Sequence, residues 1–182
     1  MEIKYFNQGK IYLKGKKENV WVNPDKDDLR SKNYEARIVI YTDKQRNIIK
    51  LGEEGGRVVI AGPGEYEIGG IEINGINSMY VLTIDGIKVV LMGKEEGEIS
   101  EKKKEKLEEA DVLMISVQAG SAQIAKKSAA NYVIPIEYEN NKEELKEFLD
   151  IFDSENLESV DSLRVEKENL PEAMEVVLLK TN

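Results

Sequence analysis

The residues of this chain whose types suit chemistry gather where an apolar run ends. In "ARIVIYTDKQRN", residues 36–47, the apolar stretch 38–41 is followed by four oxygen-bearing side chains: Thr42, Asp43, Gln45 and Asn47. Oxygen ligands of this kind are those that Mg²⁺ and Ca²⁺ prefer. Loops at strand ends also carry many binding and catalytic residues. Three interpretations stay open at this point: a cation site, the remains of a site, or an ordinary polar loop.

Two absences limit the available chemistry. The 182 residues include no Cys and no His. Without Cys there is no disulfide, thiolate nucleophile or Cys-type zinc site. Without His the commonest transition-metal ligand and the usual acid–base group at neutral pH are missing. The sequence therefore excludes structural zinc sites and His-dependent triads, and it leaves carboxylate, Lys or Tyr chemistry and oxygen-ligand cation sites.

Two further segments contain residue types found in active sites. "GPGEYE", residues 62–67, is rich in glycine but lacks the Gly-Lys-Ser/Thr of a phosphate-binding loop, so its glycines are interpreted as turn residues. Glu95, Glu96 and Glu98 are closely spaced carboxylates, the groups that serve glycoside hydrolysis. Such pairs are common by chance in an acidic chain, and we assign no role to them.

The composition predicts a single acidic, globular domain over residues 1–182. Hydrophobic residues make up 41% of the chain and charged residues 34%, and the formal net charge is −9. Because a negative surface repels phosphate backbones, nucleic acid is not an expected partner. No apolar run approaches the ~20 residues that span a bilayer, and the N-terminus lacks the apolar core of a signal peptide. We therefore expect a cytoplasmic protein that has no membrane partner.

The pattern of apolar residues predicts which elements position the candidate site. The first two thirds of the chain read as short strands, and Asp85-Gly86 between two apolar runs is a strong hairpin signal. In the last third, helices over 99–110, 121–130 and 141–152 alternate with apolar strands. This order predicts two sheets packed face to face with helices outside, a four-layer αββα sandwich of the α+β or α/β class.

Two helix starts carry capping signals. Ser100 precedes the first predicted helix and is expected to be its N-cap. Asn141 and Glu144 have the spacing of a capping box at the start of the third helix.

Several local strings, taken in order, resemble the metallo-β-lactamase superfamily, and in particular its small group of zinc-dependent hydrolases of the β-lactamase fold. The resemblance extends over nearly the whole chain and implies a metallo-β-lactamase-like sandwich of reduced size. The strings that carry it are "IKYFNQGKIYLKG", "VWVNP", "GPGEYEIGGIEINGI", "DGIKVVLMG", "ADVLMISVQAG", "YVIPIEY" and "LPEAMEVVLLK".

The resemblance fails at the positions that hold metal in that family. Its Thr/Ser-His-x-His-x-Asp-His signature aligns with the strand end described above, where Thr42 is kept. The remaining signature positions are occupied by Asp43, Gln45, Asn47 and Ile48. The family's His-x-Gly-Asp reads Leu91-Met92-Gly93-Lys94, and its Ile-Pro-x-His ends on Glu137.

Two functions follow from the resemblance together with these substitutions. The first is a non-catalytic pseudo-hydrolase with no cofactor, which acts through an unidentified protein partner or as a homo-oligomer. In it, Lys94 at the metal-bridging position forms an ion pair with Asp43 or Glu137. The alternative is a hydrolase-like enzyme that uses Mg²⁺ or Ca²⁺, or metal-independent carboxylate chemistry, in the remodelled cleft. Zinc-dependent hydrolysis is not expected because the histidines that would bind the metal are absent.

Overall fold

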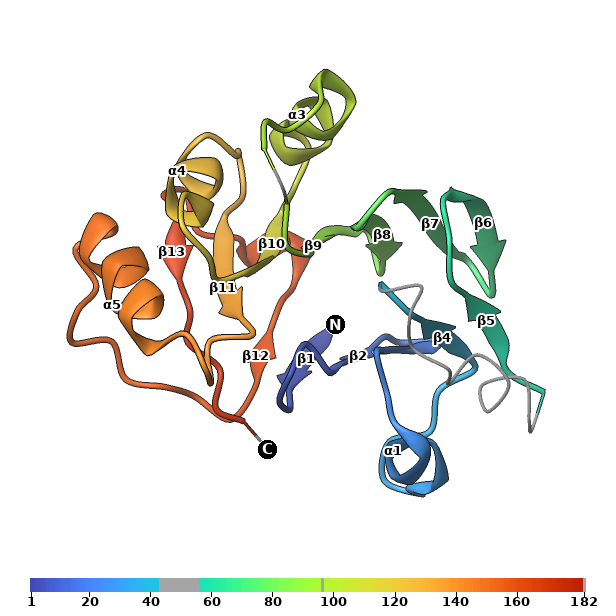
Figure 1. Cartoon of the computed structure of the whole chain (residues 1–182). Helices are drawn as coiled ribbons and strands as arrows, with labels where there is room; N and C mark the ends of the chain where they lie inside the picture. The colour runs from blue at the N-terminus through green and yellow to red at the C-terminus, as the bar shows by residue number, and fades with distance from the viewer. Residues whose placement is uncertain (43–55, 96, 182) are drawn as a thin grey trace.

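The chain folds into two β-sheets that face each other, with helices on the outer sides (Figure 1). The structure, a computed structural model, describes residues 1–42, 56–95 and 97–181. The sheets have the strand orders β12-β1-β2-β3-β4-β5 and β13-β11-β10-β9-β8-β7-β6.

The six-stranded sheet begins as an antiparallel meander and ends with parallel strands. Its strands are β1 (Glu2–Tyr5), β2 (Ile11–Lys14), β3 (Asn19–Val22), β4 (Ile38–Ile40), β5 (Val58–Ile60) and β12 (Leu163–Arg164). All three residues of β4 are buried, as expected for a strand that is covered on both faces. β4 runs parallel to both β3 and β5, so the chain reaches Thr42 at the same edge at which β3 ends.

The seven-stranded sheet has an antiparallel half and a parallel half. Its strands are β6 (Gly64–Ile68), β7 (Ile71–Ile76), β8 (Met79–Ile84), β9 (Ile87–Met92), β10 (Val112–Ser116), β11 (Tyr132–Ile136) and β13 (Glu175–Val176). The predicted hairpin is confirmed: β8 and β9 pair antiparallel around Asp85 and Gly86, whose φ angles of 53° and 80° are both positive, as a type I′ turn requires.

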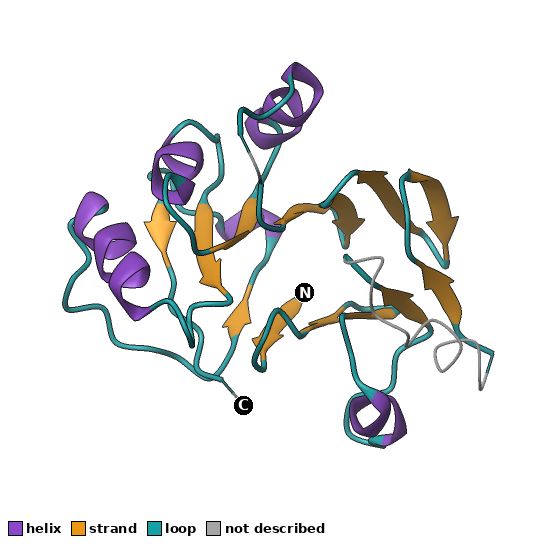
Figure 2. Cartoon of the chain, viewed as in Figure 1, coloured by secondary structure: helices purple, strands orange, loops and turns teal. Residues whose placement is uncertain are grey.

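Helices complete the outer layers of the sandwich (Figure 2). Beside the six-stranded sheet lies α1 (Lys26–Arg30), and beside the seven-stranded sheet lie α3 (Glu101–Glu108), α4 (Ser121–Lys126) and α5 (Lys142–Ile151). A 3₁₀ turn, η1, spans Lys167–Asn169. Among the described residues no helix combines the length and the apolar character needed to cross a membrane.

Three apolar clusters confirm the predicted four-layer arrangement. The largest lies between the sheets and contains Leu13, Ile40 and Leu82 among its buried members. A second joins the helices to the seven-stranded sheet, with Phe148 of α5 in its interior. The third packs Leu29 of α1 against the outer face of the six-stranded sheet. Burial of apolar surface in these clusters is the main favourable term in folding.

The predicted N-cap positions are confirmed, Ser100 for α3 and Asn141 for α5, but neither side chain forms the expected cap hydrogen bond. Asn141 makes no side-chain cap bond to α5, because its amide Nδ2 donates instead to the carbonyl of Glu137, 2.9 Å away. Ser100 precedes α3 as expected but its hydroxyl forms no cap bond. A capping box does form at the start of α1, where Asp25 and Asp28 each accept a hydrogen bond from the backbone N–H of the other.

Candidate functional site

The candidate site lies where the ends of β3 and β4 in one sheet meet the ends of β10 and β11 in the other. The turn between β1 and β2 lies between them. We call the residues that meet there the polar seam, and they are Tyr5, Gly9, Asn23, Thr42, Ser116, Glu137 and Glu139.

Asn23 organises the half of the seam that belongs to the six-stranded sheet. It follows β3 directly, is 5% exposed and has a φ of 52°, a left-handed conformation that Asn adopts more readily than most residues. Its side-chain Oδ1 accepts from the backbone N–H of Thr42 at 2.9 Å. Its Nδ2 donates to the Thr42 hydroxyl at 2.9 Å and to the Gly9 carbonyl at 3.1 Å. One amide therefore ties the end of β4 to the β1–β2 turn.

Glu137 organises the half of the seam that belongs to the seven-stranded sheet. It follows β11 with a φ of 56°. Its Oε2 accepts from the hydroxyl of Ser116, the last residue of β10, at 2.7 Å. Its Oε1 would lie 2.9 Å from a Cβ atom added to Gly9, closer than real Cβ contacts allow. The missing side chain at Gly9 thus leaves the space that the carboxylate fills.

Tyr5 joins the two halves from the interior of the sandwich. Its side chain is fully buried, and its hydroxyl accepts from the Glu137 backbone N–H at 2.8 Å and donates to Oε1 of Glu139. Burial and the hydrogen bond to the Glu139 carboxylate raise the pKa of Tyr5 far above its usual value. The phenol therefore stays protonated and cannot serve as a base near neutral pH.

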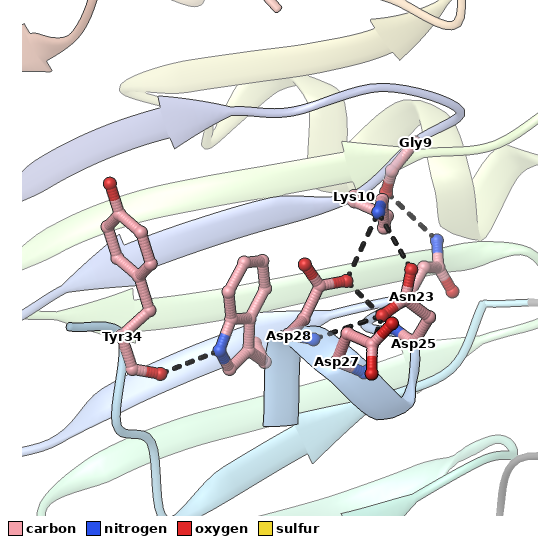
Figure 3. A network of polar contacts seen from close by, with 8 residues as sticks. Gly9, Lys10, Asn23, Asp25, Asp27, Asp28 and Tyr34 are labelled. Carbon is pink, nitrogen blue, oxygen red and sulfur yellow. Dashed lines mark hydrogen bonds and ion pairs between the residues drawn. The ribbon is translucent and has the colours of Figure 1, made fainter. Parts of the chain in front are cut away.

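An ion-pair network fixes the turn that carries Gly9 (Figure 3). Lys10 Nζ lies 3.0 Å from Asp25 and 3.2 Å from Asp28, so the α1 capping box also holds the β1–β2 turn. Burial opposes ionisation of both Lys10 and Asp25. The hydrogen bonds to Asp25 and Asp28 nonetheless raise the pKa of Lys10, and those from the Asp28 backbone and from Lys10 lower the pKa of Asp25.

Four of the residues that the sequence predicted to share a cleft lie in the described part of the chain. Thr42 and Glu137 both lie in the polar seam. Leu91 is 2% exposed and belongs to the core between the sheets, where its place in β9 directs it. Four of the predicted residues lie outside the described part of the chain: Asp43, Gln45, Asn47 and Ile48.

The predicted ion pair between Lys94 and Glu137 was wrong. Lys94 lies beyond the end of β9 and is exposed, and no ion pair joins it to a carboxylate of the described residues. The Glu137 carboxylate instead accepts a hydrogen bond from the Ser116 hydroxyl. The neighbouring residue, Glu95, forms the buried pair of this region with Lys103 of α3, which is 7% exposed. The alternative partner of Lys94, Asp43, lies outside the described residues.

Sequence reasoning assigned no site role to Tyr5, Gly9, Asn23, Ser116 or Glu139. A polar residue at the last position of a buried strand is the one sequence signal that would have pointed to Ser116. Gly9 and Tyr5 join the seam through contacts with Glu137 over more than a hundred residues of sequence, which local patterns do not reveal.

The described part of the seam does not fit a zinc centre. Zinc in proteins is bound by Cys, His or carboxylate side chains, typically three or four of them. Within residues 1–42, 56–95 and 97–181, no group of three or more such side chains is placed to hold a metal ion. Of the two seam carboxylates, Glu137 is bonded to Ser116 and Glu139 to Tyr5.

The two-sheet sandwich with a polar site at adjoining strand ends defines a metallo-β-lactamase-like protein. Residues 2–138 match the family of the beta-lactamase superfamily domain, and the chain belongs to that family. No curated protein matches the chain.

Solved structures share this fold. A proposed Zn-dependent hydrolase of the metallo-β-lactamase superfamily from Thermotoga maritima is 23% identical, with 98% of each chain covered and a TM-score of 0.77. The metallo hydrolase Igni18 from Ignicoccus hospitalis and an isothiocyanate hydrolase from Delia radicum gut bacteria are each 10% identical, and each comparison covers 91% of this chain and 99% of the other. Their TM-scores are 0.64 and 0.63. At these identities the similarity establishes the fold alone.

Proposed function

We propose that this chain is a non-catalytic member of its superfamily, which acts by binding a protein partner or a second copy of itself. The observation that carries the proposal is the polar seam. At the strand ends, Glu137 is hydrogen-bonded to Ser116 and packed on Gly9, while Asn23 links Thr42 to the same turn. Side chains that bond to one another in this way hold the two sheets together and are not free to bind a metal.

The chemistry of the sequence supports the same proposal. A metal-bound hydroxide near neutral pH requires a cation held by several side chains. The chain has no imidazole or thiolate to offer. Oxygen ligands remain, but among the described residues the seam supplies two carboxylates, Glu137 and Glu139, and each is already hydrogen-bonded.

One contact favours a second candidate, metal-independent catalysis. A hydroxyl beside a carboxylate is the arrangement of a nucleophile and its base, and Ser116 Oγ lies 2.7 Å from Glu137 Oε2. Ser116 is only 2% exposed, however, so a substrate would have to displace the residues that cover it. We therefore place this candidate second.

Metal analysis of the purified protein tests the proposal. We expect no stoichiometric zinc, iron or manganese, whereas about one bound transition metal per chain would contradict a non-catalytic role. Light scattering across a range of protein concentrations then shows whether the partner is a second copy.

Thermal unfolding with added Mg²⁺ or Ca²⁺ tests the cation enzyme. A cation that binds the native state raises the melting temperature by mass action. We expect no shift. A rise that Asp43→Ala abolishes, and that the exposed-surface control Glu172→Ala retains, would favour the enzyme instead.

A further inference from the structure

A polar pocket lies on the outer face of the six-stranded sheet, on the other side of the sheet from the main core. Its cavity measures ≈ 250 Å³. Strands β1, β2 and β3 form its floor, and the connection from α1 to β4, through residues 32–35, forms its wall. No residue of the polar seam lines this pocket.

The strand register brings the floor residues together. In β1 the side chains of Ile3 and Tyr5 enter the core, so those of Glu2 and Lys4 lie on the outer face. Lys4 stands opposite Tyr12, and Glu2 stands opposite Lys14. Lys4 and Lys14 are therefore diagonal neighbours on one sheet face, within reach of a single small ligand.

The wall of the pocket is fixed before any ligand arrives. Three side chains of the floor strands donate to its backbone: Trp21 Nε1 to the Tyr34 carbonyl at 2.8 Å, and Tyr12 Oη and Asn19 Nδ2 to the Glu35 carbonyl, each at 2.9 Å. Figure 3 shows the bond that the Tyr34 carbonyl accepts. A preformed pocket loses less conformational freedom on binding than one that must be ordered by its ligand.

Three lysines line the cavity: Lys4, Lys14 and Lys32. Lys4 Nζ lies 5.4 Å from the centre of the Tyr34 ring, a cation–π contact. Lys14 and Lys32 are exposed. Within the described residues none of these three lysines forms an ion pair, although Lys10, Lys88 and Lys103 do. The cavity lining carries three lysines and two glutamates, a positive balance on a chain with a net charge of −9.

We propose that this pocket binds a small sugar phosphate. The three ammonium groups provide point charges for the phosphate. The carboxylates of Glu2 and Glu35 also line the cavity and would repel a bare anion, but they accept hydrogen bonds from sugar hydroxyls. The pocket therefore offers positive charge to the phosphate and hydrogen-bond acceptors to the sugar hydroxyls.

Isothermal titration calorimetry with glucose 6-phosphate tests this inference, with glucose and inorganic phosphate as comparison ligands. We expect saturable binding of glucose 6-phosphate and at least tenfold weaker binding of either half alone. The double variant Lys14→Ala/Lys32→Ala should weaken binding roughly tenfold or more, because it removes two of the three lysine charges available to the phosphate. Higher salt should also weaken it, since exposed charges are screened.

The control is Lys26→Ala/Lys102→Ala, which removes two exposed lysines of α1 and α3 that do not line the pocket. It should bind as the unchanged protein does, and thermal unfolding should show both double variants folded. Three results would each overturn the inference: no saturable heat up to ~10 mM ligand, equal binding by the two double variants, or inorganic phosphate binding as tightly as the sugar phosphate.

Discussion

At the scale of single residues, the seam depends on a glycine that makes room for a carboxylate. Gly9 has a φ of 74°, and a Cβ there would meet Glu137 Oε1 at 2.9 Å. Two costs therefore fall on any side chain at position 9: the strain of a left-handed backbone and the displacement of the carboxylate.

The chain contains a matched control for these two costs. Gly70 has a φ of 85° but no atom within 4 Å of an added Cβ. We expect Gly70→Ala to lower the free energy of unfolding by about 1 kcal/mol through backbone strain alone, and Gly9→Ala to lower it by about 2–4 kcal/mol. Urea unfolding measures both. Equal losses in the two variants would show that the contact with Glu137 contributes nothing.

The sequence identified some seam residues and not others for a physical reason. Thr42 and Glu137 follow buried strands, so local apolar patterns located them. The match of Lys94 to a metal-bridging position gave no information on where its side chain points, and the structure places it in solvent. The hydrogen-bond partner of a carboxylate depends on three-dimensional packing. Ser116 ends β10, whereas Glu137 follows β11, so no local pattern in the sequence links them.

At the scale of elements, α1 and the β1–β2 turn are joined by charge. Lys10 pairs with Asp25 and Asp28, with side-chain exposures of 18%, 51% and 16%. Because these groups are partly in solvent, we expect Lys10→Met to cost only about 0.5–1 kcal/mol at neutral pH.

The pH dependence of that cost has a definite sign. The pKa of Asp25 in the folded protein is lowered from 3.8. Its contribution to the free energy of unfolding is therefore complete above pH 3.8 and is lost as the pH falls through the lowered pKa. The folded pKa of Lys10 is raised from 10.5, so its contribution is complete below 10.5 and is lost as the pH rises through the raised value.

Chemical denaturation of the unchanged protein and of Lys10→Met across this pH range measures the difference. We expect the difference in the free energy of unfolding between the two proteins to be constant from about pH 5 to about pH 10 and to become smaller at lower and at higher pH. The control Lys26→Met removes an exposed lysine of α1 that forms no ion pair within the described residues, and it should change the free energy of unfolding by close to zero at every pH. If the loss in free energy of unfolding caused by Lys10→Met stayed unchanged down to about pH 2, the role of Asp25 would be contradicted.

Element identities were easier to predict than their ends. Asp85-Gly86 specified the β8–β9 turn because both positions need a positive φ, which few other residue pairs adopt readily. The hydrogen bonding of the α5 N-cap could not be predicted from spacing alone, since the side-chain amide of Asn141 donates to the Glu137 carbonyl. The short final strands, of two residues each, depend on pairing with β1 and β11 more than on their own composition.

At the scale of the whole molecule, the two sheets share one core. The largest apolar cluster takes buried residues from both, including Leu13 of β2 and Ile134 of β11. The inner apolar face of each sheet packs against that of the other, so unfolding of one sheet removes the core contacts of both. The sequence-based prediction that residues 1–182 form a single domain therefore implies one cooperative unfolding transition.

The chain carries two independent probes of that transition. Its single tryptophan, Trp21, is 1% exposed beneath the outer layer of the six-stranded sheet, so its fluorescence reports that sheet. Far-UV circular dichroism reports the secondary structure of the whole chain, including α3, α4 and α5, which pack on the other sheet. Both signals should show the same midpoint urea concentration for unfolding.

Ile134→Ala opens a cavity in the shared core and should lower the free energy of unfolding by about 2–5 kcal/mol. It should shift both transitions equally, although Trp21 belongs to the opposite sheet. The exposed-surface control Glu172→Ala should shift neither. If Ile134→Ala moved the dichroism transition while the Trp21 transition stayed in place, the two sheets would be separate folding units.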